Sequence, residues 1–183
     1  MRKTVSVEKS NTLINPGCVV LASVTYEGFS NIITIAWQTT LSIKPRLVGI
    51  SVGFKRYSHD MIRNAGEFII NVPGRDLLDR VHGCGRVSGR KYDKYERFEL
   101  HPQPGKKVAS QGIEECLGSL ECKVVDEVTT GDHTFFVGEV LHAEAEESVY
   151  DFQVSSWKDK PESELLYHLG GNRYTTGHKW MEA

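Results

Sequence analysis

The sequence has no long apolar run and no marked excess of charge of either sign. Its longest apolar stretches, such as residues 17–24, are far shorter than the roughly 20 residues of a membrane-spanning helix. The formal net charge is -2, which gives no electrostatic reason to expect a nucleic-acid partner. Arg2 and Lys3 are basic, but no apolar run follows soon enough to form a signal peptide. We therefore expect a cytoplasmic protein with no nucleic-acid or membrane partner.

The spacings of common metal and thiol redox motifs are also missing. Cys18, Cys84, Cys116 and Cys122 include no Cys-x-x-Cys pair, which argues against a zinc knuckle and a thioredoxin-type site. The seven histidines form no His-Glu-x-x-His cluster. We expect no metal site and four free, mostly buried thiols. Cys84 lies between two glycines and is the cysteine that we expect near a cofactor.

A dinucleotide-binding fingerprint is absent as well. Gly83-Cys84-Gly85 comes nearest to Gly-x-Gly-x-x-Gly, but no strand pattern precedes it and the third glycine is missing. Short β-branched and aromatic runs outnumber helical patterns, and long helices do not separate them regularly. This arrangement disfavours a parallel Rossmann sheet and favours an antiparallel barrel. A nicotinamide nucleotide, if the protein uses one, would bind only transiently.

The chain pattern predicts one domain over residues 1–183, with a polar arm at residues 1–12. A helix is predicted to begin with Ser58 as its N-cap and to end at Gly66, and a second helical pattern covers residues 76–82. A long loop is expected from residue 83 to 97, and a turn at residues 15–17. The predicted strands cover residues 18–26, 32–37, 47–52, 68–72, 118–128 and 133–145.

Residues 31–59 form the stretch around which the rest of the chain is organised. Two apolar strands flank a predicted turn that carries Gln38, Thr39, Thr40 and Ser42. The second strand leads to a basic, hydroxyl-rich end at residues 56–59. Hydroxyls and a guanidinium beside apolar strands suit a ligand with a flat apolar body and an anionic tail.

The order of several short motifs adds to this pattern. They are Asn31, Thr34, Ala36 and Trp37; then Ser42, Pro45, Leu47 and Val48; then Arg56, Tyr57 and Ser58; then Ser88-Gly89-Arg90 with Asp93-Lys94, Gly131-Asp132-His133 and Gly138-Glu139-Val140. In this order the chain resembles the flavin reductase-like family over about residues 13–175. The flavoredoxins and ferric reductases are the most similar members. The family has an FMN-binding split β-barrel fold, so the resemblance implies a mainly β, antiparallel, Greek-key split barrel with a few short helices.

The resemblance also implies a set of FMN-binding residues. Carried over to this chain, they are Asn31, Thr34, Ile35, Ala36, Trp37, Thr39, Ser42, Ser51, Arg56, Tyr57, Ser58, Ser88 and Lys94. Arg56 and Ser58 would hold the phosphate, and His133 would position a nicotinamide as the catalytic residue. The pattern alone leaves His133 open as a turn residue and Lys94 as a solvated charge. Glu114, Glu115 and Glu121 are most simply a solvated acidic face, and His168 a buried residue.

The implied function is that of an FMN-binding oxidoreductase. It would take hydride from NADH or NADPH and pass electrons to free flavin, a ferric chelate or a protein partner. The alternative is a non-catalytic, flavoredoxin-like FMN module that carries electrons and has no nicotinamide site of its own. The family closes its site with a second subunit, so a homodimer is expected. Residues 83–97 and 167–174 are the segments expected to reach across.

Overall fold

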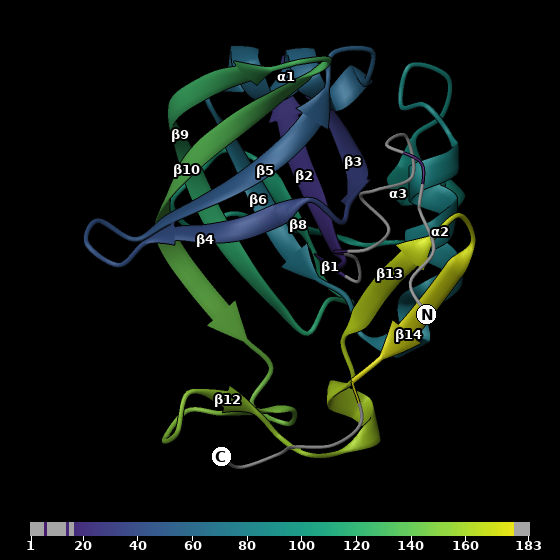
Figure 1. The fold of residues 1–183 in the computed structure, drawn as a ribbon, viewed down its shortest axis with the longest axis vertical. Coiled ribbons are helices and arrows are strands. Elements are labelled where there is room, and N and C mark those ends of the chain that lie inside the picture. The colour runs from purple at the N-terminus through teal and green to yellow at the C-terminus, as the bar shows by residue number, and fades with distance from the viewer. Residues whose placement is uncertain (1–5, 7–13, 15–16, 178–183) are drawn as a thin grey trace.

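The computed structural model describes residues 6, 14 and 17–177. Its body is a seven-stranded antiparallel sheet that curls into a barrel (Figure 1). The strands are β1 Gly17–Cys18, β2 Val20–Tyr26, β3 Phe29–Ile35, β4 Gln38–Ser42, β5 Leu47–Gly53, β6 Glu67–Val72, β7 Pro102–Pro104, β8 Gln111–Ile113, β9 Gly118–Thr130, β10 His133–Ala145, β11 Tyr150–Asp151, β12 Ser156–Trp157, β13 Leu166–Gly170 and β14 Arg173–Thr176. The helices are α1 Tyr57–Ala65, η2 Arg75–Leu77, α2 Leu78–Arg86, α3 Lys94–Arg97 and η3 Pro161–Ser163. The expectation of a mainly β, antiparallel barrel is confirmed.

One continuous segment forms both edges of the main sheet. The strand order is β3-β2-β6-β9-β10-β5-β4, so β3 and β4 lie at opposite edges although only Ala36 and Trp37 separate them. The chain leaves its pairing with β2 and joins β5 instead, and Ser51 N donates to Trp37 O at 2.9 Å where the new pairing begins. This crossing closes the barrel. Beyond it, β3 and the end of β5 are not paired with each other, and the barrel is open there.

The sheet is buried on both faces where helices cover it. Strand β2 sends Ala22 and Val24 to the barrel interior with Phe68 and Phe136, whereas its Leu21 packs on the other face in a second cluster. That second cluster includes side chains of α2, and α1 packs against β2 at one end of the barrel. Successive strand residues point to opposite faces, so a strand covered on both sides reads as an unbroken apolar run. This explains why β2 is apolar at most positions on both faces, with only Ser23 and Thr25 as aliphatic hydroxyl residues.

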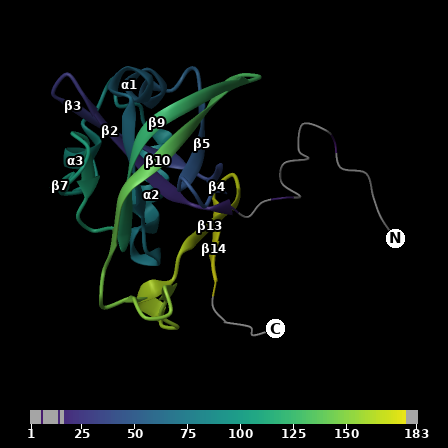
Figure 2. The ribbon, with the colours of Figure 1, turned by 90° about the vertical axis from the view of Figure 1, so that its left-hand side faces the viewer.

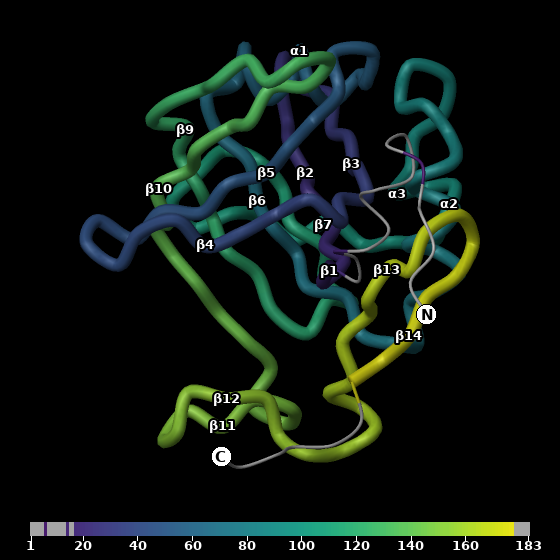
Figure 3. The backbone as a smooth tube through the Cα atoms, in the orientation of Figure 1, coloured from purple at the N-terminus to yellow at the C-terminus, as the bar shows by residue number. Residues whose placement is uncertain are grey.

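A small second sheet lies beside α2. Its order is β1-β13-β14, and the β13–β14 hairpin runs along the helix in the tube drawing (Figure 3). Residues 146–165, with β11, β12 and η3, extend beyond the end of the barrel in both ribbon views (Figures 1 and 2). No helix among the described residues is long and apolar enough to cross a membrane.

Most predicted strands are confirmed, but the predicted turn at residues 38–42 is wrong. These residues form β4, which pairs with β5, and the turn follows at residues 43–46. The hydroxyl residues do not distinguish a turn from a strand here, because a short edge strand exposes one face to solvent and tolerates polar residues on that face. The predicted strand at residues 18–26 is divided into β1 and β2. The arm at residues 1–12, apart from Ser6, and most of the predicted turn at residues 15–17 lie outside the described residues.

Helix α1 ends as predicted but begins differently. Gly66 has a left-handed conformation, with φ of 68°, and its N–H donates to Ile62 O. The N-cap is Arg56 in extended conformation, without a side-chain cap, so the assignment of Ser58 as N-cap is wrong. The Ser58 hydroxyl is buried inside the first turn, where it accepts a hydrogen bond from the Asn31 side chain at 2.7 Å.

The predicted loop at residues 83–97 is helical at both ends, whereas residues 87–93 between α2 and α3 form a loop as predicted. Helix α2 continues through Gly83 and Gly85, and α3 forms within the charged stretch. A Cβ on Gly83 would lie 2.3 Å from the Phe98 ring, and one on Gly85 would lie 3.3 Å from Thr34. These glycines therefore serve close packing of the helix rather than a turn. Asp93 begins α3 by accepting from the N–H groups of Tyr95 and Glu96.

The expectation of a solvated acidic face fails at Glu121. Its side chain is only 3% exposed, and its carboxylate accepts hydrogen bonds from the backbone N–H groups of Lys106, Lys107 and Val108. Glu121 thereby fixes an irregular loop against β9. All four cysteines are free, and Cys84, Cys116 and Cys122 are buried, as expected.

We predict that Glu121→Ala lowers the free energy of unfolding by roughly 2–3 kcal/mol, because three backbone donors lose a charged acceptor. Glu114→Ala is the matched control, since Glu114 is exposed and should change stability by less than about 0.5 kcal/mol. Urea denaturation of both variants measures the difference. Equal stability of the two variants would contradict a structural role for Glu121.

Candidate functional site

A pocket of about 420 Å³ opens where β3 and β5 separate, and we call it the split pocket. It lies beside the crossing of the chain from β3 to β4. The start of β10 and the turn of the β13–β14 hairpin complete its walls. Its lining residues are Ile33, Thr34, Ile35, Ala36, Trp37, Ser51, Val52, Gly53, Arg56, His133, His168, Gly170 and Gly171.

A second pocket of about 230 Å³ continues from the first, and we call it the loop pocket. The two pockets share Ile33, Thr34 and Arg56, so they form one groove along β3. The loop pocket lies between the start of α1 and the end of α2. Its lining residues are Asn31, Ile33, Thr34, Lys55, Arg56, Tyr57, Ser58, Cys84, Gly85, Arg86, Val87, Ser88, Gly89 and Lys94.

The loop pocket is cationic. Lys55, Arg56, Arg86 and Lys94 line it, and its described lining contains no Asp or Glu. The N-terminus of α1 also meets it through Tyr57 and Ser58, and unpaired first-turn N–H groups attract anions. Arg56 makes no ion pair with any described residue. Its guanidinium is therefore available to bind an anionic group in two-point fashion.

Lys94 is buried, so its interpretation as a solvated charge is wrong. It is 4% exposed, and its Nζ donates to Ile32 O at 2.6 Å and to Cys84 O at 2.7 Å. Burial lowers the pKa of Lys94 to about 8, and the nearby Arg56 acts in the same direction. An ammonium group has three donors, so one remains for an anion in the pocket. A bound anion would favour the charged form of this amine.

The Asn31 side chain is buried at the edge of the loop pocket. Its Nδ2 donates to Ser58 Oγ, whereas its Oδ1 has no hydrogen-bond partner among the described residues. Buried side-chain acceptors are normally paired, so this oxygen indicates a place for a ligand donor. A Cβ at Gly89 would lie 2.1 Å from Asn31 Oδ1, so only glycine lets the 88–89 backbone come this close.

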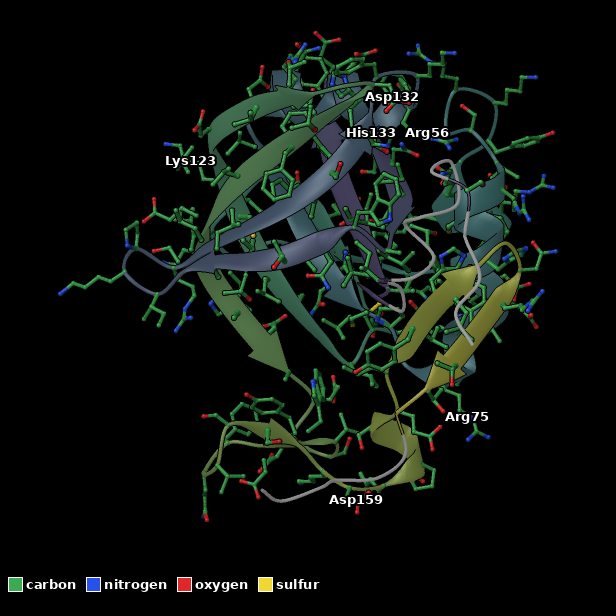
Figure 4. All side chains as sticks on the ribbon, viewed as in Figure 1. Arg56, Arg75, Lys123, Asp132, His133 and Asp159 are labelled. Carbon is green, nitrogen blue, oxygen red and sulfur yellow. The ribbon has the colours of Figure 1, made fainter. Side chains whose placement is uncertain are left out.

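His133 projects toward the split pocket from the first residue of β10. Its ring lies 5.1 Å from the Trp37 ring between centroids, and its Nδ1 is 2.6 Å from Asp132 Oδ1. The imidazole beside it lowers the pKa of Asp132. Gly53 is opposite His133 in the ladder, and a Cβ there would be 3.3 Å from Nε2. Figure 4 shows His133, Asp132 and Arg56 at the same end of the barrel.

The groove brings together most of the predicted site residues. Thr39 and Ser42 are the exceptions, because they pair with Gly49 and Leu47 on β5 and line neither pocket. The predicted residues that line the groove are Asn31, Thr34, Ile35, Ala36, Trp37, Ser51, Arg56, Tyr57, Ser58, Ser88, Lys94 and His133. Among the described residues, no group of three or more His, Cys, Asp and Glu side chains is arranged to hold a metal ion.

Sequence reasoning missed Arg86 and the hairpin residues in the groove. Arg86 was counted within a loop, although it closes α2. His168 was expected to be buried, but it is half-buried and lines the split pocket. Cys84, which we expect near a cofactor, lines the loop pocket, and burial raises its pKa to about 11, which keeps the thiol protonated. The glycines on either side of Cys84 are the sequence signal that could have placed this segment in the groove, since they mark a closely packed helix.

Comparison with known proteins gives two relatives of note. An uncharacterized protein of Archaeoglobus fulgidus is 46% identical over 112 residues, which cover 61% of this chain and 63% of that protein. A ferric-chelate reductase (NAD(P)H) of the same organism is 28% identical over 130 residues, which cover 70% of each chain. The matched part is thus just under two thirds of the first relative's length.

Two solved structures are similar along the whole chain. An FMN-binding protein from Thermus thermophilus, with bound 1-cyclohex-2-enone, is 26% identical with a TM-score of 0.87, covering 100% of this chain and 98% of that one. A flavoredoxin from Methanosarcina acetivorans is 29% identical with a TM-score of 0.85, covering 100% and 95%. The model of the flavin reductase like domain matches residues 13–176. The chain belongs to the flavin reductase-like family.

Proposed function

We propose that the groove binds FMN and that the protein is an oxidoreductase using NADH or NADPH. The observation that carries this proposal is the continuity of the groove, which joins a cationic pocket to a pocket walled by apolar and aromatic side chains. FMN has the matching order of groups, with a phosphate at one end and a flat ring at the other. When bound, it would supply the redox chemistry, taking a hydride from the nicotinamide and passing electrons to an acceptor.

The loop pocket fits the phosphate end of FMN. Arg56 and the remaining Lys94 donor are placed to bind phosphate oxygens, and the start of α1 adds backbone N–H groups. The unpaired Oδ1 of Asn31 would accept from a hydroxyl of the ribityl chain. These residues bind and orient the cofactor. Its ring would then lie in the split pocket, beside Trp37 and His133.

His133 would act on the nicotinamide rather than on the cofactor phosphate. It lies at the opposite end of the groove from Lys94, half-buried and held by Asp132. Hydride transfer to a flavin needs no acid on the donor, so its role would be to position the nicotinamide ring. The similarity to a ferric-chelate reductase that uses NAD(P)H supports this activity, and a ferric chelate is one acceptor to test.

A second candidate is a carrier of electrons between protein partners. The similarity to a flavoredoxin over the whole chain favours it. A carrier would hold the same cofactor but would lack a productive nicotinamide site. The two candidates therefore differ at the His133 end of the groove and agree at the Arg56 end.

The first test is a visible spectrum followed by anaerobic addition of NADH or NADPH. We expect flavin absorption, release of FMN rather than FAD on denaturation, and bleaching by at least one nicotinamide. Bound flavin that neither nicotinamide bleaches would replace the enzyme by the carrier. A colourless protein that gains no flavin spectrum with added FMN would remove both candidates.

Substitutions at the two ends of the groove should have different effects. Arg56→Ala removes a charge-assisted contact worth roughly 1.5–3 kcal/mol, so we expect FMN affinity to fall about 10- to 150-fold. Turnover should recover with excess FMN. Arg63→Ala is the control, because Arg63 lies on the same helix but pairs with Glu127. Unchanged FMN affinity in Arg56→Ala would exclude the phosphate contact.

His133→Ala should bind FMN with near wild-type affinity but be reduced by NAD(P)H more slowly, on the order of 10-fold or more. His142→Ala, on the same strand but beside Glu144, should behave as the wild type. Anaerobic stopped-flow measurement of flavin bleaching compares them. If both histidine variants are reduced at the wild-type rate, His133 has only a structural role.

We further propose a homodimer. Leu41 and Ile43 are 43% and 78% exposed at the edge strand β4 and the turn after it. An exposed apolar sheet edge is typical of a surface that another chain covers. The β13–β14 hairpin contacts α2 of its own chain, so β4 is the better candidate for the interface.

Light scattering at micromolar concentration should give twice the chain mass of 20.6 kDa. Ile43→Asp should shift the protein toward the monomer, because an unpaired carboxylate in an apolar interface is costly. Lys123→Asp, on exposed β9, should leave the mass unchanged. A wild-type monomer with FMN bound would contradict the dimer.

A further inference from the structure

A third pocket, of about 210 Å³, adjoins the groove, and we call it the hairpin pocket. It lies between α2 and the β13–β14 hairpin, which are neighbours in Figures 1 and 3. It shares Thr34, Ala36, His168 and Gly171 with the split pocket. Its lining residues are Val19, Thr34, Ala36, His82, Gly85, Arg86, His168, Gly171 and Tyr174.

Hydrogen bonds connect the polar side chains of Arg86, His82 and Tyr174 in this pocket. Arg86 Nε donates to His82 Nε2 at 3.4 Å, and His82 Nδ1 lies 3.3 Å from the Tyr174 hydroxyl. The His168 and Tyr174 rings are 5.2 Å apart between centroids. A second guanidinium nitrogen of Arg86 donates to the neutral Asn172 side chain. The hairpin thus orients Arg86 without neutralising its charge.

No carboxylate compensates this charge within the described part of the pocket. Its described lining contains no Asp or Glu, and Arg86 makes no ion pair with any described residue. Val19 and Ala36 contribute apolar side chains to the same lining. A cationic group in a lining with apolar side chains suits an organic anion, since the guanidinium binds two oxygens while the carbon skeleton contacts those side chains.

FMN as proposed above does not account for the part of this pocket formed by Val19, His82 and Tyr174, which line neither of the other two pockets. Its phosphate and ring would occupy the loop and split pockets, which are joined through Ile33, Thr34 and Arg56. The hairpin pocket shares Thr34, Gly85 and Arg86 with the loop pocket, and it joins the split pocket through Ala36 and His168, on the hairpin side. A ligand that enters it would therefore have its remaining atoms in the split pocket, where the flavin ring would lie.

We propose that the hairpin pocket binds the carboxylate or phosphate group of a second small ligand, with Arg86 as the specificity-determining contact and Tyr174 as a supporting donor. This proposal rests on the proposed function, because the ligand's body would reach the flavin. The anionic group belongs either to a phosphate of the nicotinamide nucleotide or to a carboxylate of the electron acceptor. Both have the same chemistry, and the experiment separates them.

The primary test titrates FMN-saturated protein with benzoate and with the neutral benzamide, following the visible difference spectrum of the flavin. We expect benzoate to bind more tightly than benzamide in the wild type. Arg86→Gln should weaken benzoate about 10- to 150-fold and leave benzamide unchanged. Tyr174→Phe should weaken benzoate about 2- to 12-fold, because it removes only a neutral donor.

Arg80→Gln is the matched control. Arg80 lies on the same helix, lines none of the three pockets and is 4.0 Å from Glu115, so this variant should bind benzoate as the wild type does. FMN is kept in excess throughout, because Arg86 also lines the loop pocket. Calorimetric titration of benzoate gives the same comparison without a flavin signal.

The source of the anionic group is found by comparing NADH with 1-benzyl-1,4-dihydronicotinamide, which has no phosphate. A selective loss of NADH affinity in Arg86→Gln assigns the pocket to the nucleotide phosphate. A loss confined to benzoate assigns it to a carboxylate acceptor. The proposal is overturned if benzoate and benzamide bind equally, or if Arg86→Gln and Arg80→Gln behave alike. Failure of the wild type to oxidise any nicotinamide would contradict the proposed function but would leave the benzoate comparison valid.

Discussion

The crossing of the chain at Ala36 and Trp37 is the constraint on which the rest of the structure depends. Because β3 pairs with β2 and β4 pairs with β5, a short extended segment must connect the two edges of a seven-stranded sheet. The sheet can satisfy this only by curling into a barrel. Closure is incomplete at one end, and the backbone edges left unpaired there form the wall of the groove.

Buried polar contacts hold this open end without closing it. Lys94 extends from α3 to the edge strand β3, where its ammonium group donates to Ile32 O, and it also donates to Cys84 O near the end of α2. Asn31 links the same strand to the start of α1 through Ser58. Side chains, rather than a neighbouring strand, thus hold this edge of β3 in place. The polar groups that stabilise the fold here, on Asn31 and Lys94, also line the loop pocket.

The sequence predicted the barrel and one wall of the groove well, since strand composition and the motif order from Asn31 to Ser58 are local signals. It failed where packing between distant segments decides the structure. Gly83 and Gly85 are typical of a loop in the sequence, but in the structure they allow α2 to pack closely against Phe98 and Thr34. Glu121 and Lys94 are charged, and only the backbone groups around them reveal why they are buried. Arg86 and His168 join the groove from two segments that are far apart in the sequence, which no local pattern could indicate.

Thr34 lies at the meeting point of all three pockets, and its hydroxyl donates to Val81 O at 2.6 Å. Thr34 therefore connects the part of the site formed by strands with the part formed by α2 and the β13–β14 hairpin. The second part lies outside the barrel core, but its Val81, Cys84 and Leu166 are buried in the second apolar cluster, against which Tyr174 packs. The same scaffold could acquire a different small-molecule preference through changes at Arg86, His168 and Tyr174 alone. Arg86 lines both the loop pocket and the hairpin pocket, so a change there would act on both, whereas Tyr174 lines only the hairpin pocket of the three.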